Sequence, residues 1–159
     1  MWSEIPDFED NFSPAELFEL QETRVSISTD REISLIDLIK AWTKDVDRLE
    51  WEHRSTHASD PGSWTVWDYI SALLARDRIA DITTLIPDSL GSKIRAWVEK
   101  KPDAKLCSFT QVDNSGIFSR FASEIAEEDL FSKDWWWNRV PVSGPVHEDL
   151  EEWAQNMGI

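Results

Sequence analysis

The chain has 159 residues and a net charge of −15, from 31 acidic and 16 basic residues. This charge argues against nucleic acid or an anionic membrane as the main partner, because phosphate groups are bound by clustered lysine and arginine. The length is that of one domain, and ten tryptophans supply ample apolar area for a core. A single cysteine, Cys107, excludes an intrachain disulfide.

The N-terminus lacks the basic region and apolar run of a secretion signal. No stretch approaches the roughly 18 consecutive apolar residues that indicate a membrane-spanning helix. The sequence therefore predicts a cytoplasmic protein without a membrane partner. Five glycines leave little room for a Gly-rich phosphate loop, and we expect no cofactor.

Residues 1–33 read as an N-terminal arm and connector, acidic and interrupted by aromatic side chains. Ser13 followed by Pro14 is typical of a helix start and predicts a short helix over 14–21. We expect the chain before it to lie extended over the body. Residues 24–29 alternate apolar and polar side chains, which predicts a strand or an extended connector without an obvious partner.

Residues 34–126 form the predicted helical body, which begins with its two strongest helices. Apolar residues recur every three or four positions over 35–51 and again over 66–85, as on one face of a helix. Ser34 and Thr65 precede these runs, and each is followed three residues later by aspartate, a variant of the capping box. Two similarly capped core helices are the simplest interpretation of this likeness.

The second half of the body is less regular. Ser89 is predicted to cap a third helix, which Pro102 breaks or kinks. Residues 103–112 remain ambiguous between helix and strand, and Ser115 is predicted to cap a helix over 116–126. The basic residues gather here: Lys93, Arg95, Lys100, Lys101 and Lys105.

Residues 127–159 are predicted to form a Trp-rich clamp and a C-terminal helix that starts at Pro145. The run Trp135-Trp136-Trp137 cannot point one way, since three consecutive side chains fan over about 200° on a helix and alternate on a strand. We therefore expect one or two of these indoles to enter the core and at least one to lie across a groove or under another segment.

The sequence contains only weak signals for a catalytic or metal site. His53 and His57 are four residues apart but lack a third ligand at a typical spacing, which favours a loop with exposed histidines. Cys107 carries no local signature of a nucleophile and is expected to be an ordinary buried thiol. No carboxylate pair stands out from the solvated helix faces, so we assign no catalytic residue and no metal.

Arg139 is the most suggestive polar residue, since a guanidinium beside indoles can stack on them and bind a carboxylate. One interpretation is that it ties the Trp run to an acidic helix face. The other is that it recognises a partner, because Trp and Arg are enriched in interface hot spots.

Trp135, Trp136, Trp137, Arg139 and Pro141 form a Trp-Trp-Trp-x-Arg-x-Pro pattern that follows several helices. With the helix starts upstream, the chain over 34–153 resembles small acidic bacterial immunity proteins of polymorphic toxin systems, including contact-dependent inhibition systems. The resemblance implies a cytoplasmic protein that binds and neutralises a cognate toxin domain, and it implies no catalytic residues.

We expect a mostly α-helical single domain, a bundle of about five or six helices with at most a minor β element. The predicted function is that of a non-enzymatic immunity protein whose acidic and aromatic side chains occlude a basic toxin surface. The alternatives are an intracellular enzyme with a carboxylate-based site and a structural or regulatory subunit. The residues predicted to bind the partner are Asp45, Asp47, Glu50, Glu52, Asp60, Asp68 and Arg139.

Overall fold

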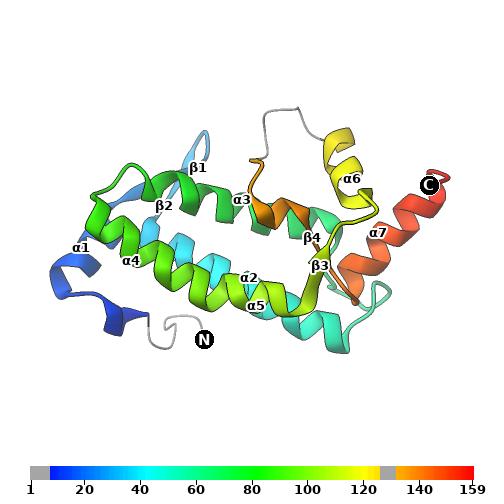
Figure 1. Cartoon of the computed structure of the whole chain (residues 1–159), viewed down its shortest axis with the longest axis horizontal. Helices are drawn as coiled ribbons and strands as arrows, with labels where there is room; N and C mark the ends of the chain where they lie inside the picture. The colour runs from blue at the N-terminus through cyan, green and yellow to red at the C-terminus, as the bar shows by residue number, and fades with distance from the viewer. Residues whose placement is uncertain (1–7, 126–131) are drawn as a thin grey trace.

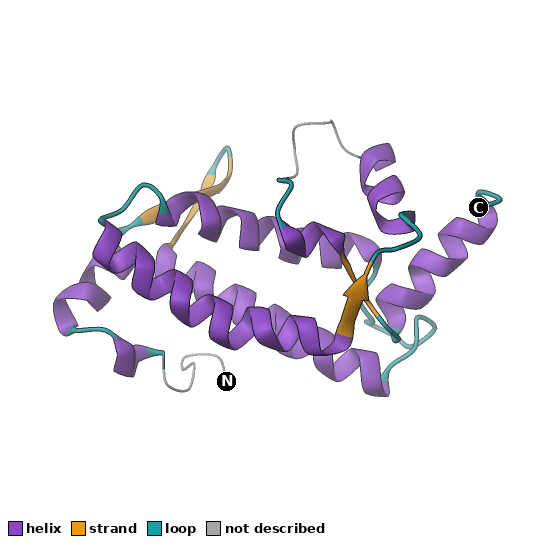
Figure 2. Cartoon of the chain, viewed as in Figure 1, coloured by secondary structure: helices purple, strands orange, loops and turns teal. Residues whose placement is uncertain are grey.

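The computed structural model describes residues 8–125 and 132–159. It is mostly helical with two small two-stranded sheets, as predicted (Figures 1 and 2). The predicted extended arm before Phe8 and the first part of the Trp-rich clamp, 127–131, lie outside the described residues. The α-helices are α1 (Pro14–Glu22), α2 (Leu35–Ser55), α3 (Val66–Thr83), α4 (Asp88–Val98), α5 (Ala104–Phe109), α6 (Ile117–Ile125) and α7 (Pro145–Asn156). The other elements are the strands β1 (Arg24–Ser28), β2 (Arg31–Ser34), β3 (Thr110–Val112) and β4 (Arg139–Pro141), the 3₁₀ turns η1 (Glu9–Asn11) and η3 (Trp135–Asn138), and the π-helical turn η2 (Glu99–Asp103).

The long helices lie side by side around one hydrophobic core. Helix α2 packs on α3 and on the rod formed by α4, η2 and α5, while α6 and α7 gather at the end that holds the C-terminus (Figure 1). Trp42 of α2 and Tyr69 of α3 are among the largest fully buried side chains. None of the described helices is long and apolar enough to cross a membrane.

The helix starts follow the predicted caps. The Ser13 hydroxyl accepts from the Glu16 amide at 3.1 Å, and the Glu16 carboxylate accepts from the Ser13 amide at 2.9 Å. Ser34 Oγ accepts from the amide three residues on at 3.1 Å. At the start of α3 the Asp68 carboxylate accepts from the Thr65 amide at 2.8 Å. These local bonds fix where α1, α2 and α3 begin.

The third predicted helix differs from the prediction at both ends. It begins at Asp88, so the preceding Pro87 and not Ser89 occupies the cap position. Pro102 does not break it, because the backbone passes through η2 and continues into α5. A π-helical turn lets the carbonyl four residues before a proline bond to the next amide. Residues 103–112 resolve into the end of η2, α5 and β3.

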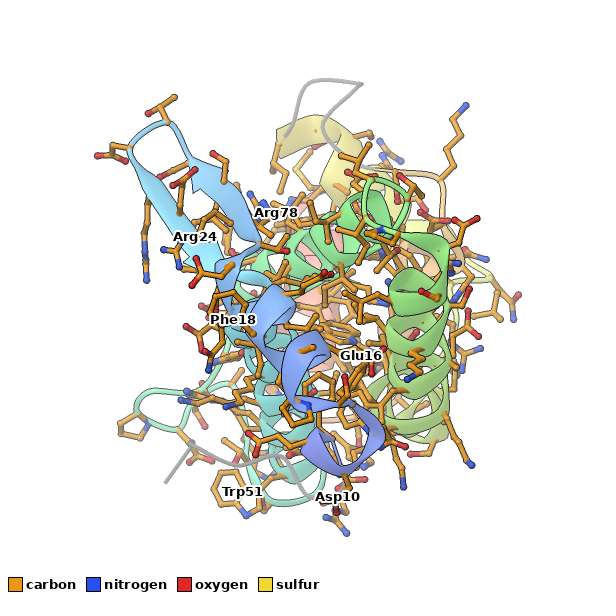
Figure 3. The ribbon with its side chains drawn as sticks, turned by 90° about the vertical axis from the view of Figure 1, so that its left-hand side faces the viewer. Asp10, Glu16, Phe18, Arg24, Trp51 and Arg78 are labelled. Atoms are coloured by element: carbon orange, nitrogen blue, oxygen red, sulfur yellow. The ribbon has the colours of Figure 1, made fainter. Side chains whose placement is uncertain are left out.

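The predicted lone strand has a partner. β1 pairs antiparallel with β2, from Arg24 opposite Ser34 to Ser28 opposite Arg31. Arg78 of α3 donates to the Ile27 carbonyl at 3.1 Å and holds this hairpin against the helix, on the side shown in Figure 3. β2 has only four residues, and its last residue, Ser34, is already the cap of α2. Such a run is too short to show the alternation of apolar and polar residues that predicts a strand.

Two details of the second half also correct the predictions. α6 begins at Ile117, and Asp113 rather than Ser115 accepts from the Ser119 amide in its first turn, at 3.1 Å. Cys107 is exposed on α5 and is not a core thiol. β3 pairs with β4, so the chain leaving α5 lies beside the chain leaving the Trp run.

Candidate functional site

An open groove of about 770 Å³ lies between α2 and the polar loop that leads to α3. Trp51 of α2 forms part of its wall and is 61% exposed, and Figure 3 places this side chain at the periphery of the molecule. An indole so exposed leaves a large apolar area in water, an arrangement typical of interface anchors. The groove residues are Lys44, Asp47, Arg48, Trp51, Glu52, Ser55, Thr56, Asp60, Pro61, Gly62 and Ser63.

Arg48 and Glu52 fix the loop wall of this groove. The Arg48 guanidinium donates to Glu52 at 3.0 Å and to the Gly62 carbonyl at 2.7 Å, and it lies 5.1 Å from the ring centre of Trp64. The other Glu52 oxygen accepts from the Trp64 amide at 2.9 Å. The position of the loop is therefore set by bonds to α2.

Helix α7 supports the same loop from behind. Glu148 lies 3.3 Å from Nδ1 of His57, and Asp149 accepts from the Val66 amide at 2.9 Å. Both carboxylates come from the first turns of α7, so the acidic start of that helix binds the loop and the first turn of α3.

The predicted partner-binding carboxylates partly converge. Asp47, Glu52 and Asp60 line the groove, and Asp47 and Glu50 also line a second pocket that adjoins it along α2. Asp60 is exposed and accepts from the His57 amide at 2.8 Å. The connecting loop and α2 thus hold these four carboxylates on one region of the surface.

Several of these carboxylates are engaged inside the protein. Glu52 is only 2% exposed and accepts hydrogen bonds from Arg48 and from the loop, so it is not a free surface acid. Asp47 forms an ion pair with Lys105 at 2.6 Å, and Asp68 caps α3. A helical surface pattern does not reveal such pairings, because the partners lie on other elements.

Asp45 lies half-buried on α2. Burial raises the pKa of this carboxyl to about 6, against the smaller opposing effects of Lys44 and Arg48, and the Asp68 carboxylate adds to the rise. Because the folded pKa is raised, the carboxyl favours the fold below about pH 4, and this contribution is lost as the pH rises through about 6.

Replacing Asp45 with asparagine, which resembles the protonated acid, is therefore expected to stabilise the protein by about 1–3 kcal/mol at pH 7.5. The difference should shrink as the pH falls through 6 and vanish near pH 4. Urea unfolding at these three pH values measures it, with Glu19→Gln on the exposed side of α1 as the control. A pH-independent difference between Asp45→Asn and the native chain would contradict this account.

Arg139 lies away from the groove. Its guanidinium donates to Oγ1 of Thr110 at 3.1 Å, and to the carbonyls of Thr110 at 2.6 Å and Cys107 at 3.2 Å. The hydroxyl of Tyr69 donates to the Arg139 carbonyl at 2.6 Å. The residue ties the Trp run to the end of α5 through backbone carbonyls, and not to an acidic helix face as expected.

Two of the three tryptophans enter the core, as predicted, whereas the third is exposed and does not line the groove. Trp136 and Trp137 are 3% and 8% exposed, while Trp135 is 41% exposed. Both buried indoles donate to the Asp77 carboxylate of α3, at 2.8 Å and 2.9 Å respectively. Ser132 adds its amide at 3.1 Å and its hydroxyl at 2.5 Å to the same carboxylate. Asp77 therefore holds the Trp run against α3.

A second buried carboxylate continues this network. Asp103 accepts from Nε1 of Trp42 at 3.0 Å and from Nη2 of Arg76 at 2.9 Å. The Arg76 guanidinium lies 4.1 Å from the ring centre of Trp136. Burial raises the pKa of Asp103, and the hydrogen bond and charge of Arg76 oppose the rise. The network joins α2, α3, η2 and the Trp run, and its role is to hold the fold.

The exposure of Trp51 could have been predicted from the sequence. Trp51 lies two residues after the buried Leu49, which turns it by about 200° away from the apolar stripe of α2. The signal for Arg76 and Asp77 was their place between Leu73 and Ile79 of the apolar face, at the start of the charged run Arg76-Asp77-Arg78. A pair in that position needs buried partners, but the pattern does not say which.

The histidines are used within the protein. His53 contacts Oγ of Ser143 at 2.9 Å, and His57 contacts Glu148. Burial lowers the pKa of His53, with the positive charge of Arg54 as a smaller cause. Across residues 8–125 and 132–159, no group of three or more His, Cys, Asp or Glu side chains is placed to hold a metal ion.

The chain was compared with known proteins. No family model, no curated protein and no solved structure matches the chain.

Proposed function

We propose that the chain is a protein-binding inhibitor of the immunity type, which neutralises a cognate toxin domain with a basic surface. The observation that carries the proposal is the exposed Trp51 on a groove that also holds Asp47 and Asp60. A large apolar anchor beside carboxylates suits a partner surface rich in Lys and Arg. The net charge of −15 favours encounter with such a surface.

The mechanism follows from these side chains. Long-range attraction brings the basic face of the partner to the acidic chain. A Lys or Arg side chain of the partner then pairs with Asp60 while an adjacent apolar or cationic group covers the Trp51 ring. The toxin loses access to its substrate because this face of the immunity protein occupies its basic cleft.

The enzyme alternative calls for convergent groups with displaced pKa values in one pocket. The carboxyls with raised pKa values are Asp45 and Asp103. Asp103 is enclosed by Arg76 and Trp42, and neither carboxyl is part of the groove wall. These positions favour binding over catalysis for the groove.

Where the neighbouring reading frame encodes a large secreted protein, its C-terminal domain is the toxin to test. Co-expression should protect the host cell, and the two proteins should co-elute on size exclusion. Trp51→Ala is expected to weaken the complex by about 30-fold or more, which is the loss typical of a hot-spot residue. Stability should change by less than about 0.5 kcal/mol, because the side chain is exposed.

Trp67→Ala is the matched control, since Trp67 is 56% exposed and lies outside the groove wall. It should leave binding within about threefold of the native value. Association should also slow markedly between low and physiological ionic strength. A fully active toxin with no complex would refute the proposed function, and equal losses for both variants would refute the assignment of the groove.

A further inference from the structure

A second pocket adjoins the groove along α2, shares Asp47 with it and lies against η2 and α5. Its volume of about 580 Å³ is in the range of small-molecule sites. The α2 wall brings Asp47 and Glu50, and the facing wall brings Lys100, Lys101 and Lys105. These lysines belong to the basic region noted in the sequence, which the proposed function does not use.

Some of these charged side chains form ion pairs within the protein, and others do not. Lys105 is paired with Asp47 at 2.6 Å, and Glu50 is paired with Arg54 at 3.6 Å. Lys100 and Lys101 are exposed, and they form no ion pair with any residue in the described part of the chain. With three lysines against two carboxylates, the pocket wall is net positive on a protein of charge −15.

Trp97 supplies an independent observation. The residue lines the same pocket and is 6% exposed, and its indole Nε1 is buried without a hydrogen-bond partner among the described residues. A buried donor left unpaired is costly, and such groups in native proteins call for an explanation. The pocket is therefore bordered by a residue with a buried donor that finds no acceptor among the described residues.

The backbone at the pocket is also unusual. Lys100 and Lys101 lie in the π-helical turn η2, and π-helical turns occur frequently at functional sites. Pro102 and Ala104 add an apolar surface between the lysines and α2. The pocket therefore offers two cationic donors next to an apolar wall.

We propose that this pocket binds a small organic anion, whose phosphate or paired carboxylates are held by Lys100 and Lys101. The apolar part of the ligand lies against Pro102 and Ala104. The carboxylates of α2 remain with Lys105 and Arg54 and form the opposite rim. The residues that hold the anion lie outside the groove wall, so the test needs no toxin.

The test follows the indole N–H signals of the full chain by ¹⁵N–¹H correlation spectra, with Trp97→Phe identifying the Trp97 signal. Phenyl phosphate and citrate are the two probes, and they distinguish phosphate from carboxylate recognition. Saturable binding of either probe with a shift of the Trp97 signal is expected. Lys100→Gln combined with Lys101→Gln should weaken that binding by about tenfold or more.

Lys93→Gln combined with Lys133→Gln is the control, because it removes the same charge outside the pocket wall. Its affinity should stay within about twofold of the native value. The proposal is overturned if neither probe saturates below about 10 mM. It is equally overturned if both double variants lose affinity alike, since the attraction would then be a general effect of charge.

Discussion

Replacing Trp136 with alanine is expected to lower the free energy of unfolding by about 3–5 kcal/mol. The side chain is 3% exposed, lies under the Arg76 guanidinium and donates to Asp77 at 2.8 Å. Truncation therefore opens a cavity and removes the ring on which a buried cation rests. Urea or guanidinium unfolding monitored by far-UV circular dichroism measures the loss.

Trp135→Ala is the control, because it also removes an indole but one that is exposed. Trp135 is 41% exposed and packs edge-on against Trp136. The substitution should cost about 1 kcal/mol or less. Equal losses for the two variants would contradict the division of the Trp run into core and surface. A loss of partner affinity with unchanged stability in Trp136→Ala would move that residue from the core to the interface.

Replacing Asp103 with alanine is expected to cost about 3–5 kcal/mol, because it leaves the buried Arg76 guanidinium without its carboxylate. Both side chains are nearly inaccessible, at 3% and 6% exposure. The same substitution removes the acceptor of the Trp42 indole. Chemical unfolding at neutral pH measures the effect, and the midpoint should fall with little change in slope.

The double variant Arg76→Met with Asp103→Leu tests the reason for this loss. Removing both charges also removes the cost of burying them, so the pair should recover much of the stability that either single variant loses. If the double variant lost as much stability as the two single variants together, this explanation would be contradicted. The loss would then come from the altered packing and not from an unpaired buried charge.

The starts of α1, α2 and α3 could be predicted because their determinants are local, whereas the predicted caps Ser89 and Ser115 were wrong for α4 and α6. Ser13 with Glu16, Ser34, and Thr65 with Asp68 each act within one turn, and the structure confirms all three. The mostly helical class follows from the same periodicity. The division of the Trp run was predictable from geometry alone, because three consecutive side chains cannot share one direction.

The long-range partners could not be predicted. Asp77 receives the indoles from residues 59 and 60 positions away, and Asp103 receives Trp42 from 61 positions away. Local patterns carry no information about such pairs. The candidate site shows the same limit, since charge and helical position placed Asp47 and Asp60 near one another but treated the buried Glu52 as a surface acid.

The π-helical turn η2 has a consequence for chain length. Each residue of an α-helix advances it by about 100° around the axis, and a π turn accommodates roughly one extra residue. The buried positions shift accordingly, from Ile94 and Val98 before the turn to Leu106 after it. Deleting the one extra residue from η2 would therefore restore a regular helix and keep Leu106 on the core face. In an alignment of related chains, we therefore expect a one-residue gap between Val98 and Leu106, where there is one, to fall within η2.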